Sequence, residues 1–185
     1  MKKITLLLAF LIFACQSPTK ISEKEVMETF NTFFEVIDND LDSFESLVTN
    51  DFFIFENSRH YSKEEFIEFV KTFDIISVNR KFEDVTIDTD YNSAHISLKQ
   101  FGEFIVNTPE GKAKLEFEWL ESAYAVKVEN KLKFKFYFSE AIKTFGFRKL
   151  SPGFRKASSQ AFLFACILIQ DYEVCSRYAF SRHTL

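Results

Sequence analysis

The order of apolar and polar residues first predicts helices. Between residues 22 and 38 apolar side chains recur every three or four positions and form one stripe, which consists of Val26, Met27, Phe30, Phe33, Phe34 and Ile37. Ser22 and Glu25 have the spacing of a capping box, so this helix is expected to begin there. Asp40 can cap a second, short helix, and Ser62 with Glu65 repeats the capping box at the start of a third.

After the third helix the apolar period changes from 3.6 to 2, which indicates strands. A short β-type run at residues 52–56 and a polar loop at 57–60 precede that helix. Beyond it, turns are expected at 88–92, 109–111 and Glu129–Asn130, and the segments between them alternate apolar with polar residues. The sequence therefore predicts four long antiparallel strands in a meander.

The strand after Gly111 changes its apolar parity. Odd positions are apolar from Leu115 to Trp119, and even positions from Tyr124 to Val128. This change predicts a β-bulge near residues 120–122, and hence a strongly curved sheet. In the last strand the inward residues are expected at the even positions 132 to 138, with Tyr137 on the other face.

This order of elements resembles the NTF2-like superfamily, which includes the SnoaL-like domains. The local matches are residues 39–44, 50–52, 61–65 and 130–132, and the resemblance covers residues 22–142. It implies an α+β fold in which three N-terminal helices pack on a strongly curved antiparallel sheet, as a cone-shaped domain at residues 22–145. A cystatin-like fold would share much of this pattern.

The N-terminus indicates export. Two lysines precede an apolar run at residues 4–14, which is shorter than the roughly 20 residues of a membrane-spanning helix, so residues 1–14 are expected to be a signal peptide. The residues Ile12, Phe13, Ala14 and Cys15 resemble the lipobox of bacterial lipoproteins. This resemblance implies a membrane anchor through lipid on Cys15 and a tether at 15–21; the alternative is an unlipidated secreted protein.

By the same resemblance to lipoproteins, an Asp directly after the lipidated Cys would favour retention in the inner membrane. This chain has Gln16 at that position. We therefore expect a protein of the bacterial cell envelope, anchored in the outer membrane and facing the periplasm.

Composition narrows the classes of function. The chain has 25 Phe among 185 residues but 4 Gly and 3 Pro, which favours long regular elements around an aromatic core. Residues 16–145 carry 25 acidic and 15 basic side chains, and this excess disfavours nucleic acid as a partner. His60, His95 and His183 are scattered, so no metal site is expected, and no cofactor motif is visible.

The C-terminal tail, residues 146–185, differs in composition from the rest of the chain. It holds 6 basic and 2 acidic residues, and an apolar run at 161–169 is compatible with a helix. Cys166 and Cys175 are expected to stay unpaired, because one helix would hold them about 13 Å apart. The alternative is that the tail is a read-through or frameshifted end.

The resemblance implies a ligand cavity between the concave sheet and the helices. Trp119, Tyr124 and Phe136 are candidates for its apolar lining, although aromatic residues on an inner face are also ordinary core. His60 and Tyr61 could reach the mouth of the cavity, or belong to an ordinary polar loop. Arg80 could bind an anionic ligand or pair with Glu83 or Asp84.

Three hypotheses follow for the function. The first is a membrane-tethered, non-catalytic module that binds a small apolar molecule or a protein partner. The second is an isomerase, dehydratase or hydrolase with a small hydrophobic substrate, which requires a buried ionisable group on the concave face; the alternation pattern offers none. The third is a homodimeric scaffold that associates through the sheet face around Phe101.

Overall fold

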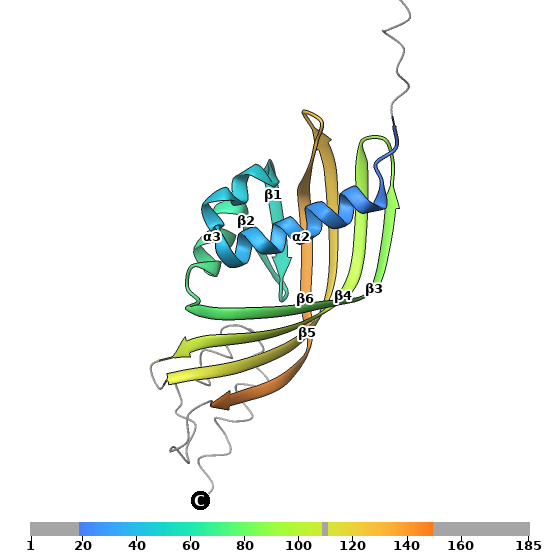
Figure 1. Ribbon diagram of the computed structural model, residues 1–185. Coiled ribbons are helices and arrows are strands. Elements are labelled where there is room, and N and C mark those ends of the chain that lie inside the picture. Colours follow the sequence, from blue (N-terminus) through green and yellow to red (C-terminus); the bar gives the residue numbers. More distant parts are fainter. Residues whose placement is uncertain (1–18, 109–110, 150–185) are drawn as a thin grey trace, which may run out of the picture.

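A computed structural model describes residues 19–108 and 111–149 (Figure 1). The helices are α2 (Glu23–Asn39), the 3₁₀ helix η1 (Leu41–Ser46) and α3 (Lys63–Val70). The strands are β1 (Val48–Glu56), β2 (Arg59–Ser62), β3 (Ile75–Thr89), β4 (Ser93–Thr108), β5 (Gly111–Val128) and β6 (Lys131–Lys149). The predicted α+β class is confirmed, and β6 continues past residue 145, where the domain was expected to end.

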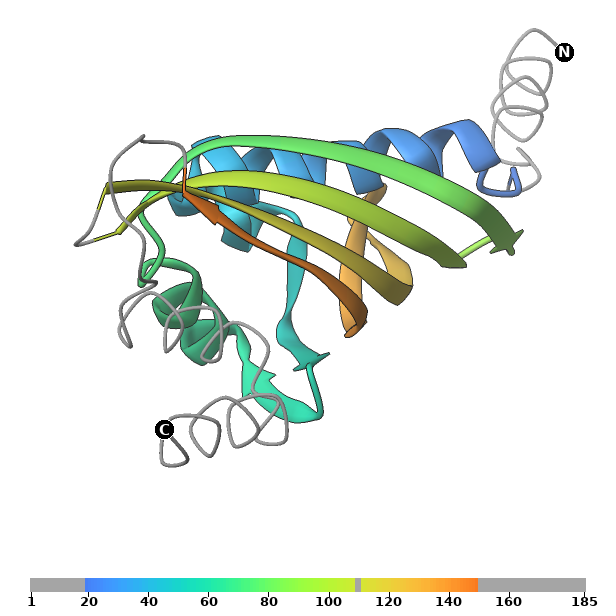
Figure 2. The same ribbon diagram turned by 90° about the horizontal axis from the view of Figure 1, so that it is seen from below.

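The helices begin where their capping residues predict. Ser22 Oγ accepts a hydrogen bond of 3.1 Å from the backbone N–H of Glu25 at the start of α2. At α3 the capping box is complete, because Ser62 Oγ accepts from Glu65 N–H and the Glu65 carboxylate accepts from Ser62 N–H. α2 lies across the concave side of the sheet, as Figures 1 and 2 show.

The six strands form one mixed sheet in the order β2-β1-β6-β5-β4-β3. The predicted meander from β3 to β6 is antiparallel, but β1 pairs in parallel with β6, which corrects the expectation of a wholly antiparallel sheet. Alternation identifies a strand but not its neighbour, and no short turn joins β1 to β6. The predicted loop at 57–60 is a tight turn at Asn57 and Ser58 that leads into β2.

The bulges lie on β6, and the predicted bulge of β5 at residues 120–122 is wrong. Tyr124 pairs with Phe136 and Ala125 with Phe134, so Lys135 is an additional residue on β6. Ile142 is a second one, because Glu118 pairs with Lys143 and Trp119 with Ala141, and a third register shift lies between Glu116 and Phe117. Together with the register shift near Asp84 on β3, these irregularities accompany the strong curvature of the long strands in Figure 2.

The residues of β5 and β6 that lie on the concave face therefore differ from those that alternation alone predicts. β5 keeps its odd residues inward along its whole length, so Glu121 is buried there together with Ala123 and Ala125. On β6 the bulge at Lys135 moves the inward face from Phe134 to Tyr137 and Ser139. Three residues with polar groups, Glu121, Tyr137 and Ser139, thus lie on the inner face of the sheet.

Two apolar clusters cover the concave face. The larger one is centred on Phe30, Phe33, Phe134 and Tyr137, and it packs α2, η1 and α3 against the sheet. The smaller one lies further along β4 and β5 and contains Val106, Ala113, Leu115 and Phe117, with Phe104 and Trp119 against it. Residues of both clusters line the space between them.

Candidate functional site

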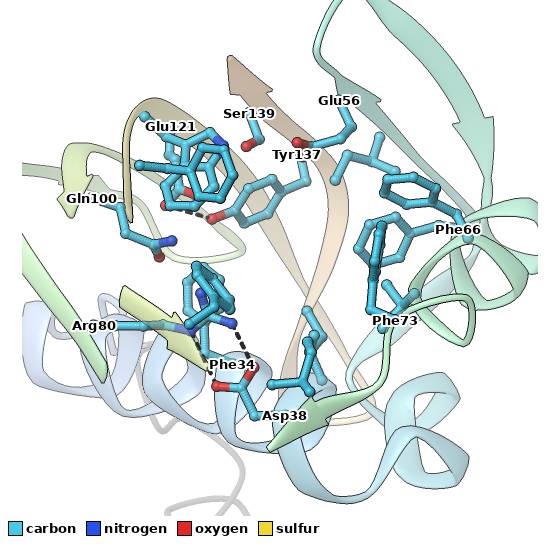
Figure 3. Close-up of a pocket in the computed structure, with 18 of the residues that line it drawn as sticks. Phe34, Asp38, Glu56, Phe66, Phe73, Arg80, Gln100, Glu121, Tyr137 and Ser139 are labelled. Atoms are coloured by element: carbon cyan, nitrogen blue, oxygen red, sulfur yellow. Dashed lines mark hydrogen bonds and ion pairs between the residues drawn. The ribbon is translucent and has the colours of Figure 1, made fainter. Parts of the chain in front are cut away.

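A cavity of about 130 Å³ lies between α2, α3 and the concave face of the sheet (Figure 3). Its walls are mostly aromatic and include Phe33, Phe34, Phe66, Phe69, Phe104 and Trp119. An apolar cavity of about 150 Å³ is large enough to hold benzene, so this one has room for a small organic molecule. Trp119 and Phe104 pack closely here because Gly102 has no Cβ, which would lie 2.8 Å from both rings.

Polar side chains from six elements reach into this apolar cavity. They are Asp38 of α2, Glu56 of β1, Arg80 of β3, Gln100 of β4, Glu121 of β5, and Tyr137 and Ser139 of β6 (Figure 3). A few convergent polar groups within apolar walls are typical of a small-molecule site.

Glu121 and Tyr137 form a buried pair. The Tyr137 hydroxyl donates a hydrogen bond of 2.9 Å to Glu121 Oε2. Tyr137 is 2% exposed and Glu121 is 5% exposed. Burial raises the pKa of Glu121 to about 8, although Tyr137 and the charge of Arg80 act in the opposite direction. Burial, followed by the charge of Glu121, raises the pKa of Tyr137 well above its usual value. Glu121 is therefore mostly protonated at neutral pH.

Glu56 is a second carboxyl with a perturbed pKa. Burial raises the pKa of Glu56 to about 8, the interaction with Ser139 lowers it, and the like charge of Glu121 raises it further. Asn57 Nδ2 donates a hydrogen bond of 2.8 Å to Glu56 Oε1. The cavity therefore contains two carboxyl groups that favour the protonated form, and either can donate a proton near neutral pH.

Arg80 is paired inside the cavity wall with Asp38. Its Nε lies 3.1 Å from Asp38 Oδ2 and its Nη2 lies 2.5 Å from Asp38 Oδ1. The guanidinium also lies against the rings of Phe34 and Phe104, with its Cζ 4.6 and 5.1 Å from their centroids. This arrangement corrects the predicted pairing with Glu83 or Asp84.

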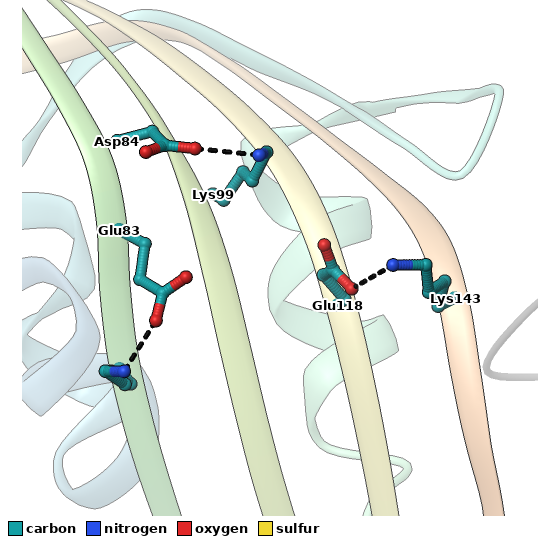
Figure 4. A network of polar contacts seen from close by, with 6 residues as sticks. Glu83, Asp84, Lys99, Glu118 and Lys143 are labelled. Carbon is teal, nitrogen blue, oxygen red and sulfur yellow. Dashed lines mark hydrogen bonds and ion pairs between the residues drawn. The ribbon is translucent and has the colours of Figure 1, made fainter.

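Those two acids belong to the outer face. Asp84 pairs there with Lys99 and Glu83 with Lys81, while Glu118 pairs with Lys143 (Figure 4). Exposed pairs of this kind contribute little to stability. The charges of Arg80 and Asp38 instead cancel each other at the cavity, and Arg80 remains close enough to act on the pKa of Glu121.

The buried side-chain oxygen of Gln100 has no hydrogen-bond partner among the described residues. The side chain is 2% exposed, and the oxygen without a partner is Oε1. A buried acceptor without a partner costs about 1–3 kcal/mol. The amide lines the cavity and is directed toward its interior in Figure 3.

The predicted site residues separate into three places. Trp119 and Arg80 line the cavity. Tyr61 is 2% exposed and packs in the core, with its ring centroid 5.2 Å from that of Phe69. His60 is exposed on β2 and stacks on Phe53, and Arg59 lies over the ring of Tyr61.

Tyr124 and Phe136 do not line the cavity. Tyr124 is 38% exposed, and Phe136 packs beside Phe53 and Phe55 outside the core. The cause is the bulge at Lys135, together with the unbroken odd parity of β5. Phe101 is half-buried and lies opposite Glu118, so a homodimer through this face remains a prediction.

Of the polar residues in the cavity, the sequence pattern indicated only Arg80 and missed the other six, which are Asp38, Glu56, Gln100, Glu121, Tyr137 and Ser139. For Gln100 a signal was present, since it follows Ala94, Ile96 and Leu98 at the inward parity of β4. Glu121 follows Leu115, Phe117 and Trp119 in the same way. A polar residue that continues an apolar parity is thus the pattern that marks this site. Tyr137 offers no such signal, because the bulge is needed to place it.

Comparison with solved structures identifies the fold. The putative scytalone dehydratase of Novosphingobium aromaticivorans has a TM-score of 0.55 at 12% identity, covering 73% of this chain and 94% of that one. An NTF2-like protein of Cytophaga hutchinsonii has a TM-score of 0.53 at 16% identity, covering 66% and 100%. This chain has an NTF2-like fold.

Other solved structures that are similar to this chain carry different names. The putative calcium/calmodulin-dependent protein kinase II association domain of Xanthomonas campestris has a TM-score of 0.55 at 16% identity, covering 69% of this chain and 93% of that one. No family model and no curated protein matches the sequence. At these identities the comparisons establish the fold alone, because proteins with one fold carry out many different functions.

Within residues 19–108 and 111–149, no group of three or more His, Cys, Asp or Glu side chains is arranged to hold a metal ion. In the same part of the chain, none of the helices combines the length and the apolarity needed to cross a membrane.

We predict that Glu121 makes stability fall as the pH rises. The pKa of Glu121 is 4.5 when unperturbed and about 8 in the folded protein. Its contribution to the free energy of unfolding is therefore fully present below pH 4.5 and decreases as the pH rises from 4.5 to about 8. The loss for one proton is at most about 1.4 kcal/mol per pH unit. In urea unfolding between pH 5 and 8, Glu121→Gln should lose less stability than the wild type, whereas Glu118→Gln on the outer face should not differ from it. Parallel profiles for the wild type and Glu121→Gln would contradict the buried carboxyl.

Proposed function

We propose that this protein binds a small, largely apolar molecule in the cavity. The observation that carries the proposal is a space of about 130 Å³ with aromatic walls, into which buried polar groups converge. A pure core would fill such a space, since interiors are packed nearly without voids. The excess of acidic residues disfavours a nucleic acid as the ligand.

A binding assay on the soluble NTF2-like domain with its tail tests this proposal. The probes are ethylbenzene, acetophenone and 1-phenylethanol, which share one carbon skeleton. We expect at least one dissociation constant of about 10 µM to 1 mM by calorimetry, as is usual for ligands of this size. Val70→Trp should fill the cavity and abolish binding, while Leu120→Trp, at an exposed position, should leave it unchanged. If Val70→Trp and Leu120→Trp bind the probes equally well, the probes do not bind in the cavity and the proposal is refuted.

The Glu121 and Tyr137 pair supports a second candidate, an enzyme that moves protons on the bound molecule. A general acid or base works best when its pKa lies near the working pH, and the pKa of Glu121 is raised to about 8. Its carboxyl can take a proton when ionised and return one when protonated. Such an enzyme also needs a hydrogen-bond donor that stabilises the oxyanion formed when the molecule loses a proton. The hydroxyl of Tyr137 or protonated Glu56 can be this donor.

Proton exchange on acetophenone distinguishes the enzyme from a pure binding protein. In deuterated water the methyl protons should exchange faster with the wild-type protein than in buffer, and the rate should rise between pH 7 and 9 as Glu121 loses its proton. Glu121→Gln should return the rate to background, and Glu118→Gln should not. An exchange rate at background for the wild type, with acetophenone bound, would leave only the binding function.

We propose further that the protein is anchored in a bacterial membrane through lipid on Cys15, with the binding domain in the periplasm. The support is the sequence alone, namely the apolar run at residues 4–14 followed by Ala14 and Cys15. When the full chain is made in bacteria fed with an alkyne-labelled fatty acid, the wild type and Cys166→Ser should carry the label. Cys15→Ser should not, and a labelled Cys15→Ser protein would refute the anchor.

A further inference from the structure

The orphan acceptor of Gln100 shows which chemical group the cavity lacks. Its Oε1 is buried and unpaired among the described residues, and the side chain belongs to the wall of the cavity. Buried polar atoms are nearly always hydrogen-bonded, so an exception calls for an explanation. An absent ligand that donates to this oxygen would provide one.

Within the described residues, the two strongest donors that line the cavity, Tyr137 and Arg80, form hydrogen bonds to groups other than Gln100. The Tyr137 hydroxyl donates to Glu121, and the Arg80 guanidinium donates twice to Asp38. Ser139 interacts with Glu56. Breaking the Arg80 pair would leave the buried carboxylate of Asp38 without its counter-charge. A bound molecule with a donor group can supply the hydrogen bond that Gln100 Oε1 lacks.

The charge balance of the cavity argues that this molecule is neutral. Arg80 is already neutralised by Asp38 at 2.5 Å, so no free cation remains among these groups to hold an anion. A cationic ligand would have to bury its charge among aromatic walls and then ionise a carboxyl to balance it. A neutral hydroxyl avoids both costs, because it can donate to Gln100 and accept from a protonated carboxyl.

We propose that the cavity is selective for neutral, mainly apolar molecules that carry a hydroxyl group, and that Gln100 recognises this hydroxyl by accepting its hydrogen bond. The inference rests on the proposed binding function and names the ligand class for the same cavity. Apolar walls hold the carbon skeleton, and Gln100 sets its orientation. Gln100 is thus the residue that determines specificity.

Four compounds with one skeleton test this selectivity by calorimetry at pH 7. They are ethylbenzene, acetophenone, 1-phenylethanol and 1-phenylethylamine, which carry no polar group, an acceptor, a hydroxyl and an ammonium group. The wild type should bind 1-phenylethanol about tenfold more tightly than ethylbenzene, the effect of one hydrogen bond that pairs an otherwise unpaired group. In Gln100→Leu this preference should disappear, while the affinity for ethylbenzene is kept or increased.

A control variant and a stability measurement complete the test. Lys99→Leu changes the neighbouring residue of β4, whose side chain pairs with Asp84 on the outer face, and should keep the tenfold preference. Without ligand, Gln100→Leu should melt no lower than the wild type, since it removes an unpaired buried oxygen. Gln100→Met serves as a second variant with the same expected loss of selectivity.

The outcomes separate this inference from the proposed function. If ethylbenzene or acetophenone binds as tightly as 1-phenylethanol, or if the preference survives in Gln100→Leu and Gln100→Met, the assignment of Gln100 is overturned while the binding function stands. Tightest binding of 1-phenylethylamine would overturn it in favour of a cation site at the carboxyls. If none of the four compounds binds the wild type, both proposals fail.

Discussion

The side chain of Tyr137 connects the hydrophobic core to the cavity, and the site depends on this connection. Its ring stacks on Phe33, with centroids 5.1 Å apart and planes at 12°, while its hydroxyl donates to Glu121 at a distance of 2.9 Å. The core fixes the ring, and the ring fixes the hydroxyl. Tyr137 faces inward because of the additional residue Lys135 on β6; with uninterrupted alternation, Phe136 would take that place. A single backbone irregularity thus introduces polar chemistry into an aromatic interior.

The polar groups of the cavity are arranged at a cost to stability. Two carboxyls are held in surroundings that favour their protonated forms, and a buried amide oxygen has no partner within the described residues. An apolar residue at Gln100 would remove the penalty of the unpaired oxygen. Groups that destabilise a fold in this way cluster at functional sites, because binding and proton transfer need them. The pairing of Arg80 with Asp38 keeps the remaining charge of the cavity balanced.

Local sequence patterns predicted the elements better than they predicted the faces of the strands. Capping residues located α2 and α3, and turn residues such as Glu129 and Asn130 located the hairpins, because these signals act over a few neighbouring residues. The parallel pairing of β1 with β6 and the bulges on β6 depend on contacts between distant segments, which no local pattern contains. Tyr124 and Phe136 were therefore assigned to the wrong face, and Tyr137 and Glu121 were missed.

The proposed chemistry of the cavity depends on a protonated Glu121 at neutral pH, and a carbon-13 NMR titration of the glutamate carboxyls measures this protonation. The signal to assign is the one that disappears in Glu121→Gln. The structure predicts that this signal titrates with a midpoint near pH 8, because burial disfavours the carboxylate. A midpoint near the unperturbed value of 4.5 would mean that water reaches the carboxyl, and it would contradict a buried acid in the cavity.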